Sequence, residues 1–130
     1  MKIIFKTSKV TIEGELNNSQ TSQKIYEKLP FEAKVNTWGE EIYFKIPVSL
    51  KPEKATLDVE LGDIAYWPEG ECLCIFFGRT PVSTSNKPRP ASEVNIVGKV
   101  TGDPSILKNI KSGDKMRVDK VVASNKEVGL

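Results

Sequence analysis

Apolar and polar residues alternate along several short stretches of the chain. In residues 9–16 every second position is apolar or Gly, and Lys, Thr or Glu occupies the positions between. Residues 31–35, 41–46 and 55–61 follow the same pattern. A period of two is that of a β-strand with one buried face, so each stretch is predicted to be a strand. Less regular apolar runs predict further strands at residues 3–5, 94–101 and 116–122.

Two stronger apolar runs, at residues 64–67 and 72–77, flank the turn sequence Pro68-Glu69-Gly70. Runs of β-favouring residues on either side of a Pro/Gly turn predict an antiparallel hairpin. Neither run alternates with polar residues, so protein is expected to cover both faces of the hairpin. We expect this hairpin to be the central element of the fold.

Two short helices are predicted, at residues 19–29 and 104–110. Candidate N-cap residues precede the first helix and Pro30 follows it. The second begins with Asp103 as a candidate N-cap and Pro104 in the first helical position. Each helix has a narrow apolar stripe, which favours covering the end of a β-structure over binding a ligand.

No regular element fits residues 79–93, which are rich in proline and serine. A structureless loop of this length is uncommon inside a compact domain and is often functional. A surface crossover without a role in binding is the alternative. Residues 123–130 are expected to form a loose tail, and no repeat or linker divides the chain, so residues 1–130 are predicted to be one domain.

The strands together predict a mainly β fold. Short antiparallel strands avoid exposed sheet edges by closing into a barrel. We therefore expect a closed antiparallel β-barrel with two short helices at its ends. A sandwich of two sheets built from the same strands is the alternative.

Charge and composition narrow the possible partners. The chain has 130 residues, with 19 Lys and Arg against 17 Asp and Glu, and its net charge is +2. The basic residues are interleaved with acidic ones, which does not indicate a nucleic-acid interface. The apolar run near the N-terminus is too short for a signal peptide or a membrane span. We expect a cytoplasmic protein without nucleic-acid or membrane partners.

The chain has no histidine, which excludes Ser/His/Asp and Cys/His catalytic sets. Gly-rich nucleotide-binding motifs are also absent. Cys72 and Cys74 lie two apart on one predicted strand and share a face, where a disulfide between them would be badly strained. Zinc would need further ligands, which only carboxylates could supply. We predict reduced thiols that are buried or line a pocket, with no metal and no cofactor; a metal or redox role is the alternative.

Large aromatic residues concentrate near the predicted strand ends and turns. Tyr and Trp combine an apolar body with a polar group, which suits a recognition pocket. Core packing is the alternative for each, above all for Trp67 and Phe77. The predicted ligand-binding residues are Trp38, Tyr43, Tyr66, Phe77, Arg79, Thr80 and Ser83.

We expect the pocket to lie between residues 38–43 and the start of the proline-rich loop, at Arg79. A guanidinium can bind a carboxylate or a carbonyl and stack on an aromatic ring. On this hypothesis Arg79→Ala weakens binding of a peptide or an acidic small molecule by about 1–3 kcal/mol. The alternative is that Arg79 lies in solvent and its loss changes nothing.

Three segments carry a family resemblance: NTWGEEIYFKIP, GDIAYWPEGECLCIFFGRTPVS and EVNIVGKVTGD. They resemble the small archaeal and bacterial cyclophilin-like family, and the similarity extends over about residues 2–122. The resemblance implies a closed β-barrel with two helices. Much of that family has no established activity.

True cyclophilins hold proline peptides in a groove with an arginine, a histidine, a glutamine and hydrophobic side chains. This chain has no histidine, and none of Arg79, Arg89 and Arg117 lies in residues 38–46, where the family's arginine is expected. The glutamines, Gln20 and Gln23, lie in the first predicted helix. No catalytic residue is therefore transferred.

The function expected is a binding module for a peptide or a small molecule. The alternative is a weak peptidyl-prolyl cis-trans isomerase that uses an apolar pocket and a hydrogen-bond donor near the prolyl nitrogen. That donor would come from Arg79, Tyr43, Tyr66 or a backbone N–H.

Overall fold

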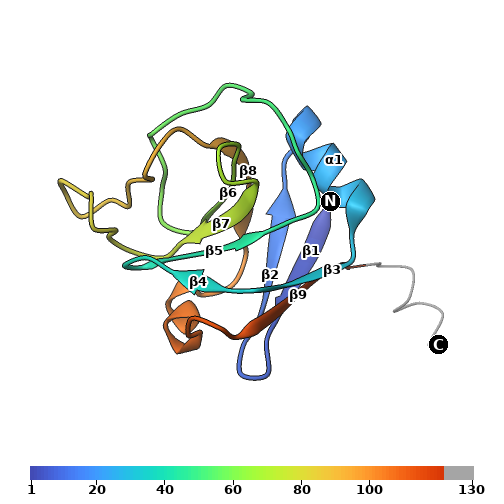
Figure 1. The fold of residues 1–130 in the computed structure, drawn as a ribbon. Helices are drawn as coiled ribbons and strands as arrows, with labels where there is room; N and C mark the ends of the chain where they lie inside the picture. The colour runs from blue at the N-terminus through green and yellow to red at the C-terminus, as the bar shows by residue number, and fades with distance from the viewer. Residues whose placement is uncertain (122–130) are drawn as a thin grey trace.

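A computed structural model describes residues 1–121, and within them the chain forms nine strands, one α-helix and one 3₁₀ helix (Figure 1). The predicted tail at residues 123–130 lies outside the described residues. The elements are β1 Lys2–Lys6, β2 Thr11–Leu16, α1 Gln20–Lys28, β3 Phe31–Lys34, β4 Asn36–Thr37, β5 Glu41–Lys45, β6 Asp63–Trp67, β7 Cys72–Phe76, β8 Asn95–Val100, η1 Pro104–Asn109 and β9 Lys115–Lys120.

The strands form one antiparallel sheet in the order β3-β9-β1-β2-β8-β6-β7-β5-β4. Its two outermost strands, β3 and β4, are consecutive along the chain and are separated by Val35 alone. β3 pairs with β9 and β4 pairs with β5, so residues 31–37 join the two edges of the sheet. The result is a nearly closed barrel (Figure 1). The predicted antiparallel barrel is confirmed, and the sandwich is excluded.

Both predicted helices are present. At the start of α1 the Ser19 side chain accepts a hydrogen bond from the Ser22 N–H at 3.1 Å. The second helix is 3₁₀ rather than α-helical, and the Asp103 carboxylate caps it by accepting from the Ser105 N–H at 3.0 Å. A 3₁₀ helix is wound more tightly than an α-helix and occurs mostly in short segments, and this one has six residues. Neither helix in residues 1–121 has the length and apolar character needed to cross a membrane.

Two segments differ from the predicted secondary structure. Residues 55–61 were expected to form a strand, but the structure has only an isolated bridge between Thr56 and Val94. Val59 is buried, whereas Leu61 is 53% exposed, so the alternating pattern does not mark one continuous buried face. The strand prediction for this segment is wrong because the segment lies over the barrel without a partner strand in register. Conversely, Asn36 and Thr37 lie between two predicted strands and form the additional short strand β4.

Buried side chains lie on both sides of the β5–β7–β6 part of the sheet. The barrel interior holds the main core, which includes Ile42, Phe44 and Tyr66. A second cluster covers the outer face of the same strands and includes Cys74 and Phe76. Every residue of β7 is buried, which confirms the prediction that protein covers both faces of the hairpin. The segments before β6 and after β7 provide the outer cover (Figure 1).

Candidate functional site

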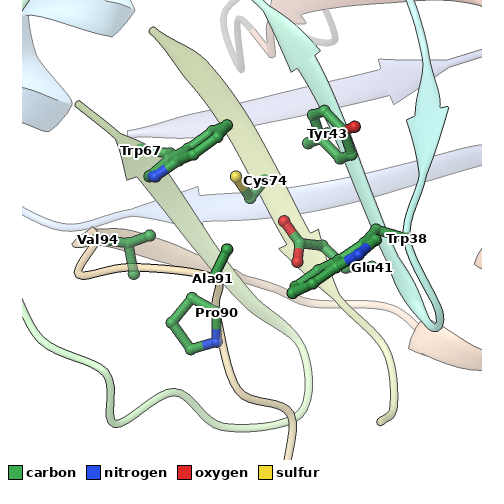
Figure 2. Close-up of a pocket in the computed structure, with 8 residues that line it drawn as sticks. All are labelled: Trp38, Glu41, Tyr43, Trp67, Cys74, Pro90, Ala91 and Val94. Carbon is green, nitrogen blue, oxygen red and sulfur yellow. The ribbon is translucent and has the colours of Figure 1, made fainter. Parts of the chain in front are cut away.

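A cavity of about 250 Å³, the outer pocket, lies on the outer face of the barrel beneath the end of the proline-rich loop. One wall comes from β5, β6 and β7 and the turn before β5, and the opposite wall from the loop and the residue before β8 (Figure 2). Its lining residues are Trp38, Glu41, Tyr43, Trp67, Cys74, Pro90, Ala91 and Val94.

Strand register places the polar residues of the sheet wall together. Tyr43 on β5 lies opposite Cys74 on β7, and Glu41 lies opposite Phe76. Because side chains alternate between the two faces of a strand, Glu41, Tyr43 and Cys74 all point away from the barrel interior. The sequence thus builds this wall from alternate positions of two neighbouring strands.

The turn before β5 positions Trp38. The N–H groups of Trp38 and Glu41 each donate to the other's carbonyl oxygen, at 2.9 and 3.2 Å. Gly39 within this turn has a φ of +59°, a conformation that glycine adopts without steric cost. A Cβ there would lie 2.9 Å from the Arg79 carbonyl oxygen, so the start of the loop packs directly on this turn.

Hydrogen bonds fix the loop that forms the other wall. The Thr80 hydroxyl donates to the Arg89 carbonyl oxygen at 2.5 Å and joins the start of the loop to its end. The indole N–H of Trp67 donates to the Ser92 hydroxyl at 2.6 Å, and that hydroxyl donates to Glu69 at 2.7 Å. These bonds fix Arg89 and Ser92, the residues on either side of Pro90 and Ala91, and so hold this wall of the pocket in place.

The most unusual group in the outer pocket is the carboxyl group of Glu41. The side chain is 6% exposed, and its Oε1 atom has no hydrogen-bond partner among the described residues. Burial raises the pKa of Glu41 from its ordinary value of 4.5 to about 7, and the thiol of Cys74 beside it offsets part of that shift. Figure 2 shows this carboxyl group in the middle of the lining residues.

The Cys74 thiol does not form a reactive thiolate in this setting. Burial, and then the neighbouring Glu41 carboxyl, raise the pKa of Cys74 well above its ordinary value. A thiol needs a lowered pKa to act as a nucleophile near neutral pH. No group of three His, Cys, Asp or Glu side chains in residues 1–121 is arranged to hold a metal ion. The chemistry of the outer pocket is therefore that of apolar and aromatic contact around one carboxyl group.

The structure brings two of the predicted site residues, Trp38 and Tyr43, together in the outer pocket. Tyr66 instead lies inside the barrel, where its hydroxyl donates to the Val48 carbonyl oxygen at 2.7 Å and accepts from the Leu50 N–H at 3.1 Å. Phe77 is also buried in the interior core. Tyr66 and Phe77 alike follow the core-packing alternative.

The other three predicted residues belong to the start of the loop. The Arg79 side chain is exposed, and one of its nitrogens donates to the Ser83 carbonyl oxygen at 3.3 Å. The Thr80 N–H donates to the Ser83 hydroxyl at 3.0 Å. None of the three lines the outer pocket, which lies at the end of the loop rather than at the predicted start. The start of the loop packs instead against the turn at Gly39.

Sequence reasoning considered Trp67 for a recognition pocket but favoured core packing for it, and it did not single out Glu41, Pro90, Ala91 or Val94 as site residues. Glu41 lies on the face of its strand opposite the one with the apolar residues, and such a face is usually exposed to water. The signal that marks it as buried is the neighbouring run at residues 72–77, which has no polar face. A strand that is covered on both sides requires cover over its neighbours as well.

Comparisons with known proteins agree with this fold. A family model of cyclophilin-like proteins matches residues 1–119. The solution structure of the hypothetical protein AF2241 from Archaeoglobus fulgidus is similar, with a TM-score of 0.80 and 35% sequence identity; the match covers 93% of this chain and 95% of that one. A search of curated proteins found no match. The sequence resemblance and the barrel are thus both accounted for: the chain belongs to the cyclophilin-like family.

Proposed function

We propose that this protein is a binding module that takes a small molecule, or one side chain of a peptide, into the outer pocket. The single observation that carries this proposal is the buried Glu41 oxygen, which has no hydrogen-bond partner among residues 1–121. Leaving a buried acceptor unsatisfied costs about 1–3 kcal/mol, and more for a charged group. A ligand that hydrogen-bonds to Glu41 would remove that cost on binding.

The dimensions of the outer pocket support a small ligand. Sites for drug-sized molecules occupy roughly 300–1,000 Å³ and are mostly apolar with a few placed polar groups. The outer pocket, at about 250 Å³, has the same character on a smaller scale. It suits a small head group or a single side chain, with the remainder of a larger ligand in solvent.

Intrinsic fluorescence gives a direct test, because both tryptophans of the chain line the outer pocket. A library of small metabolites and short peptides would be screened by thermal shift and then titrated against tryptophan fluorescence. We expect at least one ligand to raise the midpoint of unfolding and to shift the indole N–H NMR signals of Trp38 and Trp67.

A variant that fills the cavity assigns the site. Ala91→Phe places a ring in the outer pocket from its exposed wall, and we expect it to weaken binding at least tenfold. Leu61→Phe is the matched control, because Leu61 is exposed and does not line the pocket. If ligands bind Ala91→Phe as tightly as the unaltered protein, the proposed site is wrong.

Weak prolyl isomerisation is the second candidate function. The observation in its favour is that Tyr43, one of the candidate donors, lines the outer pocket beside a carboxyl group that is half protonated near neutral pH. A protease-coupled peptide assay tests it, with Tyr43→Phe and Glu41→Gln as variants. Activity that neither variant reduces would exclude a role for the pocket.

A further inference from the structure

We propose that the outer pocket selects a positively charged ligand group, such as an alkylammonium head group, with Glu41 as its counter-ion and Trp38, Tyr43 and Trp67 as aromatic walls. This inference rests on the proposed function and specifies its ligand class. The geometry that supports it is a nearly buried carboxyl group, open on one oxygen, in a small aromatic cavity.

The charges around the outer pocket favour a cation. Glu41 is the one acidic group among its lining residues, and none of them is Lys or Arg. A negatively charged ligand would meet a carboxylate without a compensating positive group. A purely apolar ligand would leave the Glu41 oxygen unpartnered and further from water. An alkylammonium group resolves both difficulties, because its charge pairs with the carboxylate and its alkyl groups contact the aromatic walls.

The aromatic walls add a second attraction. The rings of Tyr43 and Trp67 are nearly perpendicular, at 85°, with their centres 6.4 Å apart, so they form a corner of the cavity. Trp38 lies beside the Glu41 carboxyl group (Figure 2). Aromatic faces attract cations through the negative charge of the ring face, and sites for quaternary ammonium groups use this arrangement.

Protonation of Glu41 makes the inference testable by pH. The titratable groups near Glu41 are Cys74 and Cys72 on β7 and Tyr43 on β5, and the loop wall contributes Pro90, Ala91 and Val94, which do not titrate. A cation binds the ionised carboxylate, so affinity should rise with pH as Glu41 loses its proton. With a pKa of about 7, the ionised fraction increases about tenfold between pH 6 and pH 8.

The experiment compares three probes that share a trimethyl head group and differ in charge. Choline carries a quaternary ammonium group. Its isostere 3,3-dimethylbutan-1-ol, in which carbon replaces the nitrogen, is neutral, and pivalate is an anion. Each is titrated against tryptophan fluorescence, and the Trp38 and Trp67 indole N–H signals in NMR locate the binding site. At pH 8 we expect choline to bind at least tenfold more tightly than the isostere, pivalate not to bind, and choline affinity to fall about tenfold at pH 6.

Two variants separate a charge effect from a folding effect. Glu41→Gln keeps the shape of the side chain and should abolish the preference for choline. Glu40→Gln is the matched control, because Glu40 is one residue away, is not a lining residue and lies 3.9 Å from the Lys108 ammonium. If Glu41→Gln does not fold, the pH dependence of choline binding to the unaltered protein decides the question alone.

The possible outcomes are distinct. Equal binding of choline and its isostere, or choline affinity that is independent of pH, would overturn the cation inference and leave the proposed pocket intact. Failure of all three probes to bind would also overturn it, whereas the proposed function is tested separately by the wider screen and Ala91→Phe. Tight binding of choline that Glu40→Gln weakens as much as Glu41→Gln would likewise contradict it.

Discussion

The two faces of the β5–β7–β6 sheet are both buried, but they differ in the hydrogen bonding of their buried polar groups. On the inner face the hydroxyl of Tyr66 both donates and accepts a hydrogen bond within the protein. On the outer face the carboxyl group of Glu41 is buried, and one of its oxygens has no hydrogen-bond partner in the part of the chain that the structure describes. Buried polar groups in native proteins are nearly always satisfied, so an exception calls for a reason.

We attribute this difference to a division of roles between the two faces. The inner face packs large apolar side chains against one another and provides stability. The outer face is covered by a loop that leaves a small cavity over an ionisable group. Changes on the inner face should therefore act on folding, and changes on the outer face on binding and on its dependence on pH.

The largest expected effect is on the inner face. Phe44 is fully buried in the barrel, and Phe44→Ala should lower the free energy of unfolding by about 3–5 kcal/mol through lost contacts and a cavity. Urea denaturation measures this change. Tyr43→Phe, one residue along on the outer face, should change it by less than about 0.5 kcal/mol. Similar losses for the two variants would contradict the division of roles.

The second effect is a loss of stability as pH rises. Glu41 has a pKa of about 7 in the folded protein and an ordinary value of 4.5, so the folded state binds more protons between these values. The contribution of Glu41 to the free energy of unfolding should therefore be most favourable below pH 4.5. It should fall by on the order of 3 kcal/mol as the pH rises through 7.

Glu41→Gln should remove this dependence of stability on pH. The chain has no histidine, the side chain that usually titrates in this window. The carboxyl groups with a lowered pKa, such as Asp103 and Asp114, stabilise the fold above their ordinary pKa of 3.8 and lose this effect as the pH falls, so they act outside the window between pH 4.5 and pH 7. Urea denaturation at several pH values tests the prediction, and an equal slope in the Glu41→Gln variant would show that another group is responsible.

The third effect concerns the two buried thiols of the outer face. Cys72 and Cys74 are free in the structure. Replacing both by Ala should cost about 1–2 kcal/mol in stability through lost packing, without release of a metal. Metal analysis of protein purified without added zinc is the complementary measurement. Stoichiometric zinc in the unaltered protein would count against this prediction.

A smaller effect is expected where the loop is fixed. Thr80→Val removes the hydroxyl that donates to Arg89 while it keeps the shape of the side chain. The loss of this hydroxyl, which also accepts from the Val82 N–H at 3.4 Å, should cost about 1 kcal/mol and should speed amide hydrogen exchange in residues 80–92. Exchange that stays slow in this loop would show that packing alone holds the wall of the outer pocket.

The smallest effect is predicted for Arg79. Its side chain is exposed and does not line the outer pocket, so Arg79→Ala should change ligand affinity by less than about 0.5 kcal/mol. This result corresponds to the alternative in which the arginine lies in solvent. A loss of 1 kcal/mol or more would instead place the ligand against the start of the loop.

The sequence predicts the barrel well because its strands carry local signals. Alternation identifies the strand that contains Tyr43, and the Pro/Gly turn identifies the hairpin. The pattern fails at residues 55–61, where alternation occurs without a pairing strand. Strand pairing is a property of the whole sheet, and a local pattern does not contain it.

The outer pocket is harder to predict for the same reason. Glu41 lies at an alternating position that normally faces water, and the wall that covers it, Pro90, Ala91 and Val94, is distant in the sequence. Which part of a long irregular loop returns to the sheet depends on hydrogen bonds such as that from Thr80 to Arg89. The loop was identified as a candidate for function, and the pocket was expected at its start, whereas the outer pocket lies at its end.

The carboxyl group of Glu41 is held out of water in the outer pocket, where the proposed ligand would meet it. An NMR titration of the side-chain carboxyl carbon of Glu41, assigned by its absence in Glu41→Gln, tests this claim most directly. We predict a pKa of about 7 in the free protein and a lower value when choline is present, because a cation stabilises the ionised form. A pKa near the ordinary 4.5 that choline does not change would contradict the account.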